Sequence, residues 1–315
     1  MTAQAGLMTL SRAALDRLAR DTDAGTLLRH EGQLALYDSA ASFRASLPGW
    51  EARRAAGVRF DLLTDPGAIA AIQPGLSPRF SHAGFTPDWI NTVDPALWVA
   101  HLAGVLVARG GRIERAAIAA IEPGADRVRL VAEAGAVGPE LAARQVVLAA
   151  GAWSRPLLRG IGPDLPLETE RGYNTTLPAG AFDLRTHVTF ADHGFVVSRI
   201  GAGVRVGGAV ELGGLRLPPN HARARVLLDK AAAFLPGLDR RGGTQWMGFR
   251  PSMPDSLPVI GRAPGAARVI LAFGHGHLGL TQSAGTAELI ADIACDRPPA
   301  LDLAPFAPMR FTRRG

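Results

Sequence analysis

Cysteine, lysine and long apolar runs are scarce in this sequence of 315 residues. Its one cysteine, Cys295, excludes disulfides within the chain and clusters of thiolate metal ligands. No apolar run reaches the roughly 20 residues that a membrane-spanning helix needs. The first ten residues show neither the basic nor the apolar part of a secretory signal. We therefore expect a cytoplasmic protein without a transmembrane segment.

The formal net charge of +6 comes almost wholly from arginine, because Lys230 is the one lysine among 34 basic residues. The arginines are dispersed along the chain, whereas nucleic-acid binders cluster basic residues and interleave aromatic ones. We therefore expect no nucleic-acid partner. An arginine-rich composition explains the charge, and an anionic small-molecule substrate or cofactor would also suit a basic protein.

Helix signals are clearest in the first third of the chain. Asp65-Pro66 and Asp94-Pro95 each combine an N-cap residue with a proline in the first turn. The helix that begins after Asp94 is expected to stop at Gly110-Gly111. Ser11 is a candidate cap for an earlier helix, and residues 39–56 predict another.

The pattern changes to strands after residue 111. Residues 145–150 are almost wholly apolar, which favours a parallel strand buried on both faces. Residues 168–211 contain alternating segments typical of an antiparallel sheet. Further strands are expected at residues 112–121, 128–131, 246–249 and 269–273, and further helices at residues 220–234 and 281–295.

Buried parallel strands on both sides of an antiparallel segment predict a mixed α/β protein with two parts. We expect residues 1–30, 94–163 and 245–315 to form a discontinuous, nucleotide-binding Rossmann-like layer. Residues 31–93 and 164–244 would form the inserted antiparallel-sheet domain, which binds the substrate.

The sharpest local motif is the glycine-rich turn at residues 274–279, between a strand and the last helix. Its letters satisfy G-x-G-x-x-G, but a dinucleotide fingerprint needs a second parallel strand in a unit of about 30 residues. Here the chain runs into Arg297-Pro298-Pro299 instead. The turn still offers close backbone approach and a helix N-terminus, which suit a polar ring edge that gains negative charge. An ordinary strand–helix turn is the alternative.

Two weaker motifs accompany this turn. Arg250, held between a strand and Pro251, is suited to binding a carboxylate with two hydrogen bonds, although many such arginines are simply solvated. The strand at residues 145–150 ends in Ala149, Ala150 and Gly151, and such small residues let a cofactor pass close to the backbone. Helix–strand packing would explain the small residues equally well.

Other catalytic signatures are missing from the sequence. It contains no G-x-S-x-G, no H-E-x-x-H and no P-loop. His275 and His277 are the only two of the eight histidines that lie close together in the turn, and no third ligand is near them in sequence, so we expect no metal. Tyr173 is one of two tyrosines; it is a candidate for lining a substrate pocket or for a purely structural role.

In this order the motifs resemble the D-amino-acid oxidase superfamily of FAD-dependent oxidoreductases. The sequence is most similar to the small subunit of bacterial D-amino-acid dehydrogenases, and the resemblance extends over essentially all of the chain. It implies an enzyme that transfers a hydride from a D-amino acid or related amine to the flavin, giving an imino acid.

The resemblance also assigns site residues. Arg250 would hold the substrate carboxylate, and His275, His277 and Tyr173 would complete the catalytic group. Ile118 would contact the adenine, and the pyrophosphate and ribose would lie against Ala149, Ala150, Gly151 and Trp153. The pyrimidine side of the flavin would be wrapped by Gly274, His275, Gly276, His277, Leu278, Gly279 and Thr281.

One departure from the family pattern leaves an alternative open. Members begin with a strand, a G-x-G-x-x-G turn, a helix and a strand that ends in an acidic residue, and none of these precedes Met1-Thr2-Ala3-Gln4. We therefore expect a truncated FAD-binding layer. The alternative is a non-catalytic homologue or subunit that needs a partner chain, an oligomer or a longer start to hold FAD. Oxygen, a quinone or another acceptor would reoxidise the flavin. For the location of the protein, the periphery of the inner membrane is an alternative to the cytoplasm.

Overall fold

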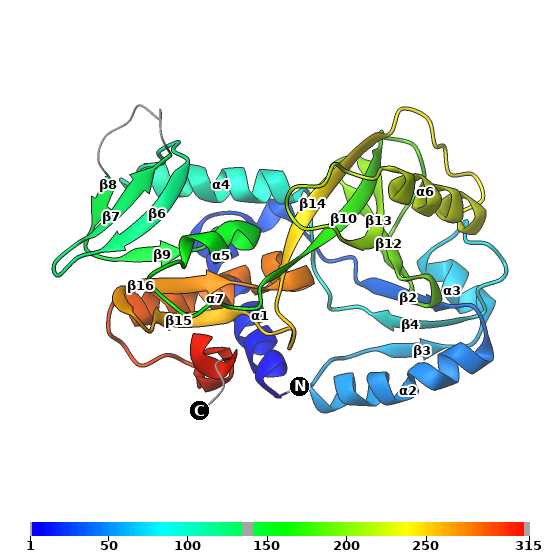
Figure 1. The fold of residues 1–315 in the computed structure, drawn as a ribbon. Helices are drawn as coiled ribbons and strands as arrows, with labels where there is room; N and C mark the ends of the chain where they lie inside the picture. The colour runs from blue at the N-terminus through cyan, green and yellow to red at the C-terminus, as the bar shows by residue number, and fades with distance from the viewer. Residues whose placement is uncertain (1, 134–140, 312–315) are drawn as a thin grey trace.

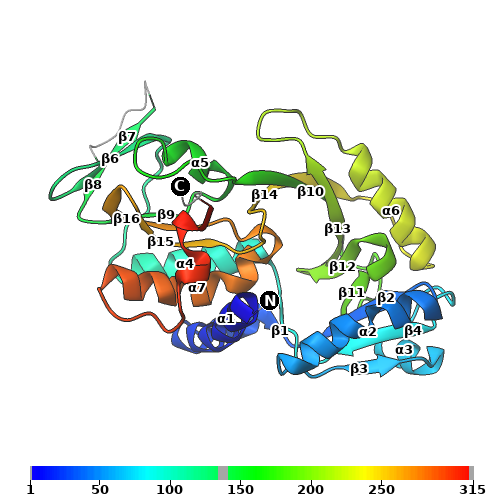
Figure 2. The same ribbon diagram turned by 60° about the horizontal axis from the view of Figure 1, so that its bottom comes forward.

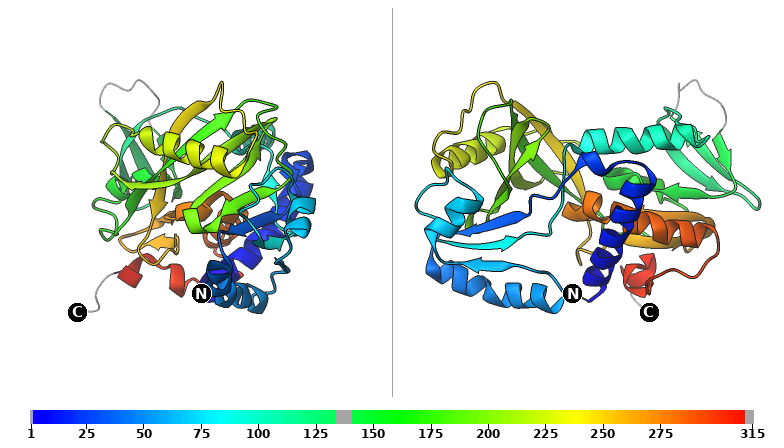
Figure 3. Two further views of the ribbon diagram at one scale, coloured as in Figure 1. Left: turned by 90° about the vertical axis from the view of Figure 1, so that its right-hand side faces the viewer. Right: turned by 180° about the vertical axis from the view of Figure 1, so that it is seen from behind.

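The computed structural model describes residues 2–133 and 141–311, whose strands lie in four sheets. Figure 1 shows two parts side by side, one built around an eight-stranded sheet and the other around two three-stranded sheets. The turned views in Figures 2 and 3 show the same division, with the long strands β14 and β10 running between the two parts. This arrangement confirms the predicted mixed α/β class.

The eight-stranded sheet draws its strands from distant pieces of the chain. Its order is β14 (Thr244–Ser252), β10 (Glu168–Leu177), β13 (Gly203–Leu212), β12 (Phe195–Ile200), β11 (His187–Phe190), β2 (Gln33–Tyr37), β4 (His82–Thr86) and β3 (Asp61–Leu63). The helices of this part are α2 (Ala40–Ala55), α3 (Pro66–Ile72) and α6 (Ala222–Phe234). A core that includes Phe80, Phe190, Phe195 and Phe234 fills the space between sheet and helices.

The other part contains two three-stranded sheets, in one of which β9 (Val146–Leu148) and β16 (Ala266–Phe273) are parallel. That sheet has the order β15 (Val259–Ala263), β16, β9, and the other has the order β6 (Ile118–Pro123), β7 (Val128–Ala132), β8 (Leu141–Ala143). Its helices are α1 (Thr2–Asp21), α4 (Pro95–Ala108), α5 (Ser154–Leu157) and α7 (Gly279–Ala294). The short strands β1 (Leu28–Arg29) and β5 (Asn91–Thr92) pair with each other.

The predicted helix starts are confirmed where a capping residue marks them. Ser39 caps α2, and the Asp65 side chain accepts hydrogen bonds from the backbone N–H groups of α3. Asp94 does the same for α4, which ends at Ala108 with Arg109 as C-cap, just before the predicted stop at Gly110-Gly111. These caps are purely local, which is why the sequence predicts them well.

The prediction that Ser11 begins a helix is wrong. Ser11 lies inside α1 and is buried, because α1 packs against α7 at this point. A Cβ at Gly285 of α7 would lie 2.5 Å from Ser11 Oγ, so both positions need small residues. A small buried residue and a cap residue look alike in sequence.

Two strand predictions need correction. The strand expected at residues 112–121 begins only at Ile118. The strands of residues 168–211 pair with one another antiparallel, as expected, and β11 pairs parallel with β2 outside that range. β9 is parallel to β16 as expected, but it is not buried on both faces, since Val147 is 44% exposed. β14 lies in the eight-stranded sheet although residue 245 was expected to begin the other part; the domain boundaries stay a prediction.

Candidate active site

The structure brings the three sequence motifs together at one edge of the parallel sheet. β9 and β16 run parallel with Leu148 opposite Leu271, so their carboxyl ends lie side by side. The chain leaves these ends as residues 149–151 and 274–276. Ser252, the last residue of β14, forms an isolated antiparallel bridge to His275. The carboxyl ends of adjacent parallel strands are the usual place for ligands in such sheets.

The glycine turn after β16 has a backbone that favours glycine. Gly274 and Gly276 have φ angles of 86° and 53°. A Cβ at Gly274 would lie 2.7 Å from Met253 Cγ, so the turn packs tightly on the end of β14. The short 3-10 helix at Gly276–Leu278 then leads into α7, whose N-terminus has no side-chain cap. The first N–H groups of α7 are thus left for another acceptor.

The two histidines of the turn engage different elements. His275 Nε2 lies 3.0 Å from Thr286 Oγ1 of α7, and burial lowers the pKa of His275 to about 4. His277 is exposed, and its Nε2 lies 2.7 Å from Glu170 Oε2 of β10. Among residues 2–133 and 141–311, no three His, Cys, Asp or Glu side chains form a group that could hold a metal ion.

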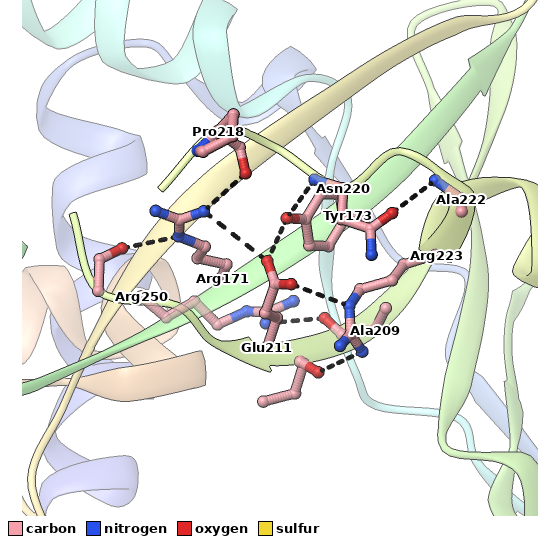
Figure 4. A network of polar contacts seen from close by, with 11 residues as sticks. Arg171, Tyr173, Ala209, Glu211, Pro218, Asn220, Ala222, Arg223 and Arg250 are labelled. Atoms are coloured by element: carbon pink, nitrogen blue, oxygen red, sulfur yellow. Dashed lines mark hydrogen bonds and ion pairs between the residues drawn. The ribbon is translucent and has the colours of Figure 1, made fainter. Parts of the chain in front are cut away.

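Arg250 lies on β14, which pairs directly with the neighbouring strand β10. Its backbone is opposite Glu170, and its guanidinium lies over Gly172, where a Cβ would be 2.2 Å from Nη2. Nη1 donates to the carbonyl oxygen of Ala209 at 3.3 Å (Figure 4). Burial lowers the pKa of Arg250, and the charge of Glu170 partly opposes this. In the described part of the chain, no carboxylate forms an ion pair with the guanidinium.

Glu170 is a site residue that the sequence did not single out. Partial burial raises the pKa of Glu170, but the hydrogen bond from His277 and the charge of Arg250 outweigh it, so the pKa lies below its ordinary value. Glu170 is therefore ionised at neutral pH. Its position beside Arg250 depends on strand register, and its contact with His277 joins residues 107 positions apart; no local pattern signals either.

The sheet face that carries Arg250 and Glu170 also holds exposed apolar side chains. Side chains alternate between the two faces of a sheet, and directly opposed residues share a face. Val210 and Leu212 of β13 oppose Gly172 and Glu170, and Trp246 of β14 belongs to the same face as Arg250. These three apolar side chains are 41–74% exposed. Near the glycine turn the face thus offers the cation of Arg250 and the anion of Glu170 beside apolar side chains, while Arg205 lies over Trp246 farther along the strands.

Tyr173 lies on the opposite face, within a buried polar network (Figure 4). Its hydroxyl donates to Glu211 and accepts from the Asn220 N–H at 2.9 Å. The neighbouring Arg171 is fully buried and donates to the carbonyl oxygens of Gly214 and Pro218. This network connects β10 and β13 to the segment that leads into α6. It therefore stabilises the sheet on the face opposite Arg250.

The remaining predicted site residues follow the strand ends. Gly151 has a φ of 55°, and Trp153 is 51% exposed with its ring 5.3 Å from that of Phe249. Ile118 begins β6 in the neighbouring three-stranded sheet. Leu278, Gly279 and Thr281 lie in the short 3-10 helix and the first turn of α7.

Comparison with known proteins places these features in a wider group. Residues 2–293 match the DAO family, described as FAD-dependent oxidoreductases. The chain is 35% identical over 300 residues to a D-amino-acid oxidase of Bradyrhizobium diazoefficiens, covering 94% of this chain and 70% of the relative. It is 32% identical over 311 residues to a D-amino acid dehydrogenase of Paramagnetospirillum magneticum, covering 96% and 72%. The crystal structure of glycine oxidase from Geobacillus kaustophilus superposes with a TM-score of 0.86 at 25% identity, covering 97% of this chain and 82% of that one.

Proposed function

The chain belongs to the DAO family of FAD-dependent oxidoreductases, and on that premise we propose that it oxidises a D-amino acid or a related amine to the imino acid. The observation that carries the proposal is Arg250, a partly buried guanidinium without an ion pair among the described residues, at the strand end that meets the glycine turn. Such a cation is suited to a carboxylate ligand. The names of the two bacterial relatives support an amino acid as that ligand.

The turn at residues 274–279 fits the flavin end of FAD. Two glycines with positive φ bring the backbone close to the end of β14, and the uncapped N-terminus of α7 offers N–H donors and a partial positive charge. We propose that these groups, with Thr281, hold the pyrimidine edge of the ring. The AMP end would lie along Ile118, Ala149, Ala150, Gly151 and Trp153.

When bound, FAD accepts the hydride from the substrate α-carbon. The task of the chain is then to position that carbon. Arg250 holds the carboxylate on the open sheet face, and its backbone strand leads directly to the turn through the bridge of Ser252 to His275. The substrate side chain would lie against the apolar surface of Val210, Leu212 and Trp246. Holding reactants in register is worth many orders of magnitude in rate.

The proposal extends to location and assembly. None of the helices in the described ranges is both long and apolar enough to span a membrane, and the one cysteine suits the reducing cytoplasm. Attachment to the periphery of the inner membrane is part of the same proposal. α4 exposes Leu97, Val99, Leu106 and Val107 by 49–60%, which supports a partner chain or a second copy on this helix.

The direct test replaces Arg250 in the FAD-loaded protein. Arg250→Ala should raise the KM for D-amino acids by at least about 10- to 150-fold, because the loss of even one charge-assisted hydrogen bond costs roughly 1.5–3 kcal/mol. Arg250→Lys should recover only part of this, since it keeps the charge but not the planar fork. Arg199→Ala on β12 is a matched control that should leave KM unchanged. An unchanged KM in Arg250→Ala would remove this residue from substrate binding.

A further inference from the structure

Glu170 places a negative charge beside Arg250 on the open face of the sheet. The two residues are directly opposed on β10 and β14, a geometry that puts their Cβ atoms roughly 4.5–5.5 Å apart. Yet the side chains diverge. Arg250 leans over Gly172 toward Ala209, whereas Glu170 reaches His277 of the glycine turn. The two opposite charges are therefore neighbours whose side chains point apart and bind different groups.

We propose that Glu170 is a specificity-determining residue, whose carboxylate binds the ammonium group of the substrate while Arg250 binds its carboxylate. This inference rests on the proposed function and narrows it to α-amino acids bound as zwitterions. A carboxylic acid or hydroxy acid of the same shape would bind more weakly. It would bring its negative charge toward Glu170 but lack the ammonium group that offsets the charge of Glu170.

The position of Glu170 also fits the direction of the reaction. Its Oε2 accepts from His277, in the turn that the flavin edge would contact, so the carboxylate lies between the carboxylate-binding guanidinium and the turn. The bond that joins the amine nitrogen to the α-carbon would then run toward the turn. An amino acid anchored at both ends has less freedom to rotate than one held by its carboxylate alone.

The main alternative is that Glu170 only supports His277. His277 is half exposed, with 53% of its side chain accessible, and ion pairs between exposed groups stabilise little. Such a support would affect all ligands alike. An ammonium-binding carboxylate, in contrast, attracts an amino acid and repels a simple carboxylate. The two roles thus predict different effects of one substitution. A structural role lowers the affinity for an amino acid and for a simple carboxylate alike, whereas an ammonium-binding role lowers only the affinity for the amino acid.

Glu170→Gln separates these roles with two probes, D-alanine and propionate, titrated calorimetrically without oxygen into the purified chain loaded with FAD that has been reduced beforehand, so that D-alanine binds but is not oxidised. D-alanine should bind about 10-fold more weakly to Glu170→Gln, because a charge-assisted hydrogen bond becomes a neutral one. Propionate, which lacks the ammonium group, should bind equally well or more tightly. Glu170→Asp keeps the charge but withdraws it, so its D-alanine affinity should fall between those of Glu170→Gln and the wild type.

Two results would overturn the inference. A parallel loss of D-alanine and propionate binding would show a structural role, and unchanged D-alanine binding would show no role. His277→Gln is the matched control: if it reproduces the opposite response of the two probes, the selectivity belongs to His277 instead. Arg250→Ala tests the proposed function separately, because it should weaken both probes whatever Glu170 does. Thermal unfolding of each variant checks that the fold is kept.

Discussion

Gly172 is expected to be the residue that lets Arg250 adopt its binding position. A Cβ at residue 172 would lie 2.2 Å from Nη2, 2.4 Å from Cζ and 2.7 Å from Nη1 of Arg250, against ordinary contacts of 3.4–4 Å. Gly172→Ala must therefore push the guanidinium away by about 1 Å or more. Because the tip of a long side chain moves easily, the fold should tolerate this shift. Alanine is also favoured over glycine in a strand by roughly 0.5–1 kcal/mol.

Gly172→Ala should therefore lower the affinity for the ligand and leave the stability of the fold unharmed. A displaced guanidinium loses its bond to Ala209 and at least one of two hydrogen bonds to a ligand carboxylate. At roughly 1.5–3 kcal/mol for a charge-assisted bond, the affinity for D-alanine should fall about 10- to 150-fold. The melting temperature should stay unchanged or rise.

Calorimetric titration of D-alanine into Gly172→Ala loaded with FAD that has been reduced beforehand, without oxygen, measures this effect free of turnover. Gly104→Ala on α4 is the matched control, because nothing lies within 4 Å of a Cβ there, and it should bind D-alanine normally. In an Arg250→Ala background the Gly172→Ala change should cost nothing further, since the two act through one group. Wild-type affinity in Gly172→Ala would refute the assigned position of Arg250.

Three further predictions concern stability. Tyr173→Phe should destabilise the fold by about 0.5–1.5 kcal/mol in urea, because it removes the hydrogen bonds of the buried hydroxyl to Glu211 and from the Asn220 N–H, while Glu211 keeps its contact with Arg223; a loss of D-alanine affinity at unchanged stability would instead support a catalytic role. Gly285→Ala should cost about 1–3 kcal/mol by forcing α1 from α7 at Ser11, and a wild-type urea midpoint would contradict that packing. His275, with a pKa lowered from 6.5 to about 4 by burial, stays neutral in the fold while the unfolded chain takes up a proton. His275 should thus contribute a fall in stability of up to about 3 kcal/mol as the pH drops from about 6.5 to about 4. Because burial also lowers the pKa of His187 to about 4, urea midpoints for His275→Asn should keep a slope but a shallower one than the wild type.

Local signals in the sequence predict much of the fold. The caps at Ser39, Asp65 and Asp94 place three helices to within a residue or two, because a cap and its helix lie within one turn of chain. Ser11 shows the limit of such signals. Whether a serine caps a helix or packs inside one depends on what lies opposite, here Gly285 of α7.

The candidate site was predictable in its parts but not in its arrangement. The glycine turn and Arg250 stand out in the sequence because each has an unusual local composition. Glu170 and Gly172 do not, because their meaning comes from the register of β10 against β14. For Tyr173 the sequence left a substrate-lining and a structural role open, and the register of β10 places its hydroxyl in the buried polar network. Strand pairing between distant segments carries this information, and composition does not.

The most direct test of the account is an absorbance spectrum of the purified chain after incubation with FAD and removal of free flavin, recorded without oxygen before and after a D-amino acid is added. The account predicts retained flavin bands that bleach on addition of the D-amino acid, and much slower bleaching in Arg250→Ala. Flavin bands that no D-amino acid or related amine bleaches would contradict the proposed function. A chain that retains no flavin would contradict the assignment of the flavin edge to residues 274–279 of this chain alone.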